Sequence, residues 1–305
     1  MTAALLHVAV LLVFPPFLFG IIRKTKAMVA GRVGPPLAQT YVDIVKLLRK
    51  GAVYSTTTTW VFAAGPIVSL AAVMSAGLLV PIGTRAPLEF TGDVVAFAAL
   101  LALGRYFTMA AALDTGSSFE AMGASREAAF SAFAEPAMFL GLTTLCVPVH
   151  ALSFGDALRS WSATASSIAQ PALLAAAITL FVVLLAENSR IPFDDPTTHL
   201  ELTMVHEVMI LDHGGPDLAF LLYASTVKLF IIGTVVVHMF LPHGGRAPGI
   251  ETVWLLLGQM ALAVVIGLVE SVTARLRLAK IPEILIGATV ITVLGLITLF
   301  YQGRP

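Results

Sequence analysis

Long runs of apolar residues alternate with short polar segments along almost the whole chain. Eight runs reach about 18 residues or more, the length an α-helix needs to cross ~30 Å of hydrocarbon. We therefore predict an all-α polytopic membrane protein with eight transmembrane helices, formed by residues 1–305 as a single integral membrane domain. The predicted spans are residues 3–22, 62–80, 94–113, 130–150, 168–187, 218–241, 251–273 and 283–301.

The polar segment after the first span contains a second kind of pattern. From Pro36 onward, apolar positions recur with helical period, and charged positions lie mostly on the opposite face. This pattern predicts a short amphipathic helix in the membrane interface or beneath a partner. A basic anchor for the first two spans and a docking element are both consistent with it. The apolar face comprises Leu37, Tyr41, Ile44, Val45 and Leu48.

The basic residues are distributed unequally between the two sides of the predicted membrane. Twelve lie in the first, third, fifth and seventh loops, and four lie in the other loops and the termini. The positive-inside rule places the odd-numbered loops in the cytoplasm and both termini outside.

Composition agrees with this picture and limits the chemistry. The chain is 58% hydrophobic and 12% charged, against about 25% charged residues in soluble domains. Its formal net charge is zero, which gives no indication of nucleic-acid binding. Its one cysteine, Cys146, cannot hold an iron–sulfur cluster, since that needs about four cysteines. We therefore expect no cofactor on this chain, and expect any redox metal on another chain.

The fifth loop and its borders, residues 186–220, are unusually rich in titratable groups. Seven acids and three histidines accompany one basic residue, Arg190. A loop that only connects two spans does not need such a set, so we expect function here. The acids are Glu187, Asp194, Asp195, Glu201, Glu207, Asp212 and Asp217.

Local patterns within this loop restrict its chemistry. Pro192 and Pro196 predict a stiff turn, and Asp195 is placed to cap a helix that begins at Pro196. A helix over 197–211 would put His199, His206 and His213 on one stripe, about 10.5 Å apart along the axis. Such histidines cannot share a metal ion. They fit either a proton route or hydrogen-bonded polar positions on a buried face.

Three ionisable residues lie inside predicted spans, where an unpaired charge costs several kcal/mol. Glu135 is either functional or paired, with Arg105 as its candidate partner. Lys228, about ten residues into its span, must pair with a carboxylate or face water.

The remaining titratable groups have simpler interpretations. We expect Glu120 and Glu127 to be solvated at the cytoplasmic edge, and Glu270 to form an ion pair with Arg275 or Arg277. His7 and His238 are expected near the outer surface, where water would solvate them.

Three segments of the chain resemble one family: 31-GRVGPPLAQTYVDIVKLLRK-50, 122-MGASREAAFSAFAEPAMF-139 and 187-ENSRIPFDDPTTHLELTMVHEVMILDHGGPDLAF-220. They resemble the membrane subunits called subunit 4 of formate hydrogenlyase and component C of hydrogenase-4. This family is similar to the H-type membrane subunit of respiratory complex I (subunit 1 in mitochondria). The resemblance covers essentially the whole chain.

The resemblance implies a subunit of a bacterial or archaeal cytoplasmic membrane that is not catalytic alone. It would anchor [NiFe]-hydrogenase large and small subunits and an iron–sulfur subunit, beside antiporter-like membrane subunits. The [NiFe] centre and iron–sulfur clusters would lie on those partners. The complex I motif is matched by Glu187, Arg190, Pro192, Phe193, Asp194, Pro196 and Glu201.

This sequence also departs from the complex I motif, at Asp195, Thr197 and His199. The departures favour the hydrogenase branch, and quinone binding is not carried over from complex I.

Our main hypothesis is a docking subunit that also conducts protons. The predicted pathway comprises Glu135, Glu187, Asp194, Glu201, Glu207, Lys228 and His206. The predicted charge partners are Arg105, Arg126 and Arg190. Alternatives are a structural anchor without conduction, and a quinone-reducing subunit of the complex I type.

Overall fold

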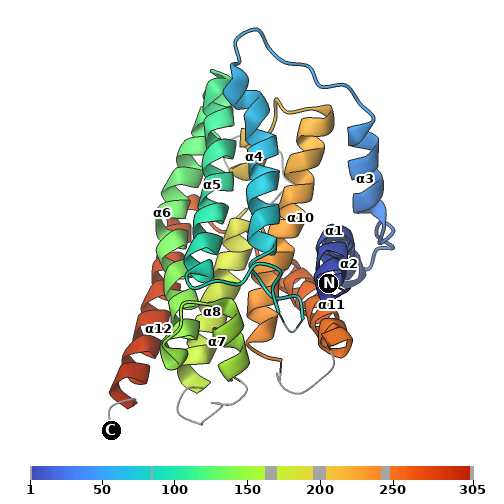
Figure 1. Cartoon of the computed structure of the whole chain (residues 1–305). Coiled ribbons are helices and arrows are strands. Elements are labelled where there is room, and N and C mark those ends of the chain that lie inside the picture. The colour runs from blue at the N-terminus through green and yellow to red at the C-terminus, as the bar shows by residue number, and fades with distance from the viewer. Residues whose placement is uncertain (1, 84, 162–169, 195–203, 242–247, 303–305) are drawn as a thin grey trace.

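The computed structural model describes residues 2–83, 85–161, 170–194, 204–241 and 248–302 (Figure 1). Every regular element in these ranges is helical, so the predicted all-α class is confirmed. The α-helices are α1 (Thr2–Val13), α2 (Pro15–Val29), α3 (Gln39–Leu48), α4 (Trp60–Gly77), α5 (Asp93–Asp114), α6 (Ser118–Cys146), α7 (Phe154–Trp161), α8 (Gln170–Glu187), α9 (His206–Met209), α10 (Gly215–His238), α11 (Pro248–Val272) and α12 (Ile281–Gln302). Short 3-10 helices cover Val147–Val149 and Leu278–Lys280.

The long helices overlap the predicted spans. In the described part of the chain, six are long and apolar enough to cross a membrane, namely α4, α5, α6, α10, α11 and α12. The pair α1 and α2 is long and apolar enough only when taken together and is bent by 43°, and α8 is a shorter apolar helix. The predicted count of eight is reached when the bent pair counts once and α8 is included.

The bend in the first span has a local cause. Pro15 and Pro16 lack the N–H groups that would continue α1, and proline is tolerated in the first turn of a new helix. The apolar run therefore divides at Phe14, and α2 continues past the predicted boundary to Val29.

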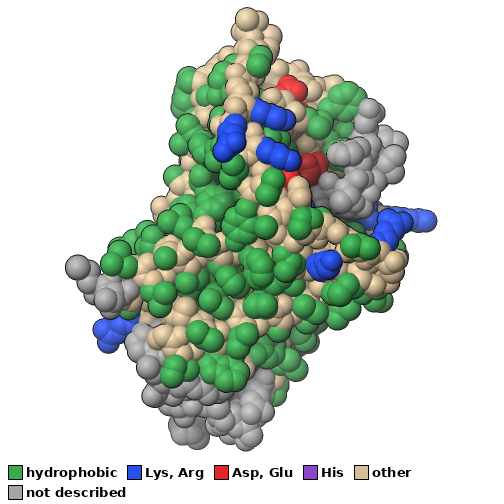
Figure 2. Space-filling view, turned by 90° about the vertical axis from the view of Figure 1, so that its right-hand side faces the viewer, with side chains coloured by type: hydrophobic (Ala, Val, Ile, Leu, Met, Phe, Trp, Pro, Cys, Tyr) green, Lys and Arg blue, Asp and Glu red, His purple; other side chains and the backbone are tan. Residues whose placement is uncertain are grey.

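The helices are arranged as a bundle with a crossing layer at one side. In Figure 1, α4, α5, α6 and α10 run lengthwise, α12 lies at one edge, and α1 and α2 are seen nearly end-on at the other. The predicted amphipathic helix after the first span is present as α3, and its Tyr41 hydroxyl donates to the Val13 carbonyl. Figure 2 shows basic side chains gathered near the top of the face that carries α3, above a broad apolar surface.

A close crossing of α2 and α11 positions part of the candidate site. A Cβ at Gly267 of α11 would lie 2.8 Å from the Thr25 Cβ and 3.2 Å from the Ile22 carbonyl oxygen of α2. Only glycine permits this approach. One turn further along α11, Glu270 consequently meets Lys26 of α2.

Two helix boundaries are decided by the structure. Arg126 continues α6, which runs unbroken from Ser118, and the Ser125 hydroxyl donates to the Met122 carbonyl within that helix. The helix predicted over 197–211 is wrong in its described part, because only His206–Met209 is helical there. The Asp194 carboxylate instead receives the N–H groups of Val205 and His206, at 3.2 Å each. Asp195 and His199 lie outside the described residues.

The expected solvation of the two outer histidines is also wrong. His7 and His238 are 3% and 6% exposed. The His7 Nε2 lies 3.0 Å from the Gly77 carbonyl oxygen, and the His238 Nε2 lies 2.8 Å from that of Pro81. The His7 ring therefore joins α1 to the end of α4, and the His238 ring joins α10 to the segment just after α4.

Candidate functional site

A buried carboxylate at the end of α8 connects three helices. The Glu187 Oε1 lies 2.9 Å from the Arg105 Nη1 of α5, and its Oε2 lies 3.6 Å from the Lys228 Nζ of α10. The Glu187 side chain is 2% exposed. Burial strips water from all three charges, so each depends on its partner. Lys228 was expected to pair with a carboxylate because it lies deep in its span, and that carboxylate is Glu187.

Arg105 extends this cluster to a fourth helix. Its Nη2 lies 3.2 Å from the Glu135 Oε1 of α6, so the pair considered from sequence is present. The Glu135 side chain remains 42% exposed, whereas that of Arg105 is 4% exposed. Glu135 therefore stands at the accessible end of a charge series that continues inward through Arg105, Glu187 and Lys228.

Three polar cavities border this series, and they share lining residues. The largest, of about 170 Å³, is lined by Glu187, His206, Glu207 and Lys228 among others. A cavity of about 30 Å³ shares His206 and Lys228 with it. A third, of about 20 Å³, shares Glu187 with the largest. A water molecule occupies about 30 Å³ in the liquid, so the largest has room for several.

Two acids expected to be solvated instead belong to the interior. Glu127 lines both smaller cavities, beside Arg105. Glu120 is 1% exposed, and its Oε1 accepts the N–H of Asp212 at 3.0 Å. The expectation failed because α6 begins at Ser118 and packs along α5 and α9. The sequence did offer a signal: Glu127 lies about two helical turns before Glu135, so the two acids fall on the same face of one helix.

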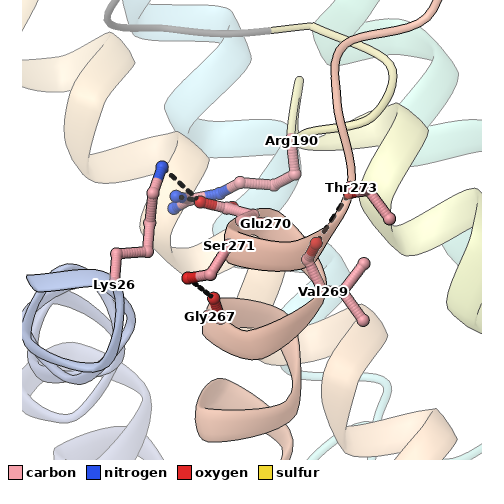
Figure 3. A network of polar contacts seen from close by, with 7 residues as sticks. All are labelled: Lys26, Arg190, Gly267, Val269, Glu270, Ser271 and Thr273. Carbon is pink, nitrogen blue, oxygen red and sulfur yellow. Dashed lines mark hydrogen bonds and ion pairs between the residues drawn. The ribbon is translucent and has the colours of Figure 1, made fainter. Parts of the chain in front are cut away.

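A second buried carboxylate, Glu270, is held by two cations from distant parts of the chain (Figure 3). The Lys26 Nζ lies 2.8 Å from its Oε2, and the Arg190 Nη1 lies 3.4 Å from its Oε1. The pairing expected with Arg275 or Arg277 is wrong. Arg275 reaches Asp194 instead, at 2.7 Å from the Nη2 to the Oδ1.

The other predicted site residues lie around these clusters. Arg126 donates to the Met204 carbonyl at 2.8 Å and to the Met122 sulfur at 3.2 Å. Asp194 is 3% exposed and also lines the smallest cavity. Glu201 lies outside the described residues. The described part of the chain holds no group of three His, Cys, Asp or Glu residues placed to bind a metal.

Burial sets the protonation of groups on the loop between α8 and α10. It lowers the pKa of His206, and the positive charge of Lys228 lowers that pKa further. Burial also lowers the pKa of Arg190. His206 is therefore held as a neutral imidazole, which can both accept and donate a proton.

His213 supplies a pH-dependent prediction. Its ring stacks on Phe62 with centroids 4.0 Å apart, and neither ring nitrogen has a hydrogen-bond partner among the described residues. Burial lowers its pKa below 6.5, although Asp217 and Asp212 oppose this effect. The stabilisation from neutral His213 is therefore complete above about pH 6.5 and is lost as pH falls through the folded-state pKa.

We expect His213→Phe to reduce the fall in Tm between pH 7 and pH 5, since phenylalanine keeps the stack and cannot bind a proton. Thermal unfolding of the purified chain across this range measures the effect. A decline as steep as that of the unmodified chain would contradict it. His206 remains in the variant, so part of the slope should persist.

These features define a class, a polytopic helical membrane protein with buried ion pairs bordering polar cavities. A family model described as NADH dehydrogenase matches residues 1–301, and the chain belongs to this family. The resemblance inferred from three segments is thereby confirmed.

Relatives of known name support the assignment. Formate hydrogenlyase subunit 4 of Escherichia coli (strain K12) is 31% identical over 290 residues, covering 92% of each chain. Hydrogenase-4 component C of the same organism is 30% identical over 246 residues, covering 79% of this chain and 75% of the relative. An H-type subunit of the NADH-quinone oxidoreductase of Cytophaga hutchinsonii is 26% identical over 253 residues, covering 76% of this chain and 71% of the relative.

A solved structure shares the fold. A chain of the membrane-bound sulfane sulfur reductase, an archaeal respiratory membrane complex, superposes with a TM-score of 0.85. The two are 24% identical, and the match covers 97% of this chain and 98% of the other.

Proposed function

We propose that this chain anchors the hydrophilic arm of a membrane-bound [NiFe] hydrogenase, related to complex I, and forms the first part of its proton path. Two of its relatives are subunits of formate hydrogenlyase and hydrogenase-4. The observation that carries the proposal is that Glu135, Glu187 and Lys228 are joined by ion pairs, with Arg105 as their charge partner, beside polar cavities that share lining residues.

The geometry suits proton transfer for a physical reason. A proton moves along a series of groups only when their proton affinities are close; burial by itself brings carboxylates and amines closer in proton affinity, whereas ion pairing separates them. Glu127, His206 and Glu207 line the adjoining cavities. Water in these cavities would bridge groups that do not touch.

The assembly around the chain forms part of the proposal. Hydrogenase large and small subunits and an iron–sulfur subunit would dock at the cytoplasmic loops, including the loop between α8 and α10. The [NiFe] centre and iron–sulfur clusters would belong to those partners, and antiporter-like subunits would continue the path in the membrane. Both termini would lie outside the bacterial or archaeal cytoplasmic membrane.

A structural anchor without proton conduction is the second candidate. Glu187, Asp194 and Glu270 each form an ion pair within the chain. Such pairing is also what a rigid anchor requires.

Neutral substitutions in the assembled complex separate the two candidates. We expect Glu135→Gln and Glu201→Gln, made singly, to lower proton movement roughly tenfold or more while the complex still assembles. Proton uptake by membrane vesicles and co-purification of the subunits are measured together. Glu283→Gln, at an exposed position at the start of α12, is the matched control.

The outcomes distinguish the candidates. Unchanged proton movement in both variants would remove the two acids from the path. Failure of assembly alone would favour the structural anchor.

A further inference from the structure

The largest polar cavity carries more positive charge than its own carboxylates balance. It lies between α2, α9 and α10, beside the turn after α8 and the end of α11. Its cations are Arg23, Lys26, Arg190 and Lys228. Its carboxylates are those of Glu187, Glu207 and Glu270. The lining by itself therefore sums to +1 when His206 is neutral, and Arg23 is in addition paired with Asp43 outside the lining, at 3.7 Å.

The excess is located around Arg190. A single carboxylate, Glu270, pairs with both Arg190 and Lys26. The Arg190 contact is the longer one, at 3.4 Å, against 2.8 Å for Lys26. Glu187 is engaged elsewhere, by Arg105 and Lys228. One cation of the Glu270 group is thus left without a full counter-charge.

Arg190 itself has a free donor in this position. It is 6% exposed, and its guanidinium carbon lies 4.0 Å from the centroid of the Phe19 ring. Its Nη2 is buried and has no hydrogen-bond partner among the described residues. A buried guanidinium nitrogen without an acceptor is costly, and more so when charged. Burial lowers the pKa of Arg190, Glu270 opposes this effect, and the nearby charge of Arg23 adds to it.

We propose that this cavity binds a small oxyanion of the phosphate type, held by the Arg190 Nη2 and the Lys26 ammonium. A guanidinium donates well to phosphate oxygens, and an ammonium adds a point charge. The cavity, of about 170 Å³, has room for such a group. The phosphate of an anionic lipid and a free phosphate share this chemistry. The site does not depend on proton conduction, so either proposal can fail alone.

Thermal unfolding of the full chain tests the site. The chain is placed in nanodiscs of phosphatidylcholine, and inorganic phosphate is titrated against chloride at equal ionic strength. A second preparation replaces part of the phosphatidylcholine with phosphatidylglycerol. We expect a saturable rise in Tm of about 5 °C with one source of the oxyanion. A rise in Tm with phosphate alone would indicate that the site binds a free anion. A rise with phosphatidylglycerol alone would indicate that it binds a lipid headgroup.

Three variants make the result specific to the cavity. Arg190→Lys and Lys26→Gln should each weaken binding about tenfold or more. Lys26 is partly exposed, so Lys26→Gln tests the site even if Arg190→Lys folds poorly. Lys24→Gln is the control, because Lys24 also lies on α2 but donates to the Val33 carbonyl outside the cavity. The proposal is overturned if neither source raises Tm, or if Lys26→Gln binds as well as Lys24→Gln.

Discussion

Replacement of Glu187 by alanine is expected to destabilise the folded protein by about 3–5 kcal/mol. The substitution leaves Arg105 and Lys228 buried without their shared carboxylate, with side chains 4% and 15% exposed. Chemical denaturation of the chain in lipid nanodiscs measures the loss. Glu283→Ala, at an exposed position, should stay within about 0.5 kcal/mol of the unmodified chain.

A double substitution identifies the cause of this loss. If uncompensated charge is responsible, Lys228→Met should cost less in the Glu187→Ala background than alone, because it removes a cation that has lost its partner. Additive costs for the two changes would show that Glu187 and Lys228 are not coupled. Equal stability of Glu187→Ala and Glu283→Ala would contradict the buried ion pair itself.

Replacement of Asp194 by alanine should cost about 3 kcal/mol, since one carboxylate joins three segments. Its Oδ1 pairs with Arg275, and its Oδ2 accepts the N–H groups of Val205 and His206 at the start of α9. Asp194→Asn keeps an acceptor for those N–H groups but loses the charge, so its cost should be smaller. Denaturation ranks the variants, and hydrogen exchange reports on the two amides.

The exchange rates give the sharper criterion. The amides of Val205 and His206 should exchange faster in Asp194→Ala than in Asp194→Asn. Asp43→Ala is the comparison, because Asp43 pairs with Arg23 at 3.7 Å between side chains 39% and 45% exposed. That change should cost less than about 1 kcal/mol. Slow exchange in Asp194→Ala would show that other contacts hold α9.

The sequence pointed to the region of the candidate site, but it did not reveal which charged groups meet there. The density of acids in residues 186–220 indicated a functional loop, and Lys228 inside an apolar span required a partner. Glu127 and Glu120 were misjudged, because α6 begins far ahead of its apolar run. Glu270 was assigned to neighbours in sequence, whereas it contacts Lys26 and Arg190.

The sequence by itself determined the helical membrane class, the positions of the spans, the amphipathic helix α3 and the family. These follow from local properties, namely the length of apolar runs, helical period and the motifs within one segment. Only the tertiary structure decided which charges meet. The pairing of Glu187 with Arg105 and Lys228 depends on three helices ending or crossing at one depth. The pairing of Glu270 with Lys26 depends on the close approach at Gly267. Burial makes the loss of either partner costly, and burial is a property of the packed bundle and not of the chain.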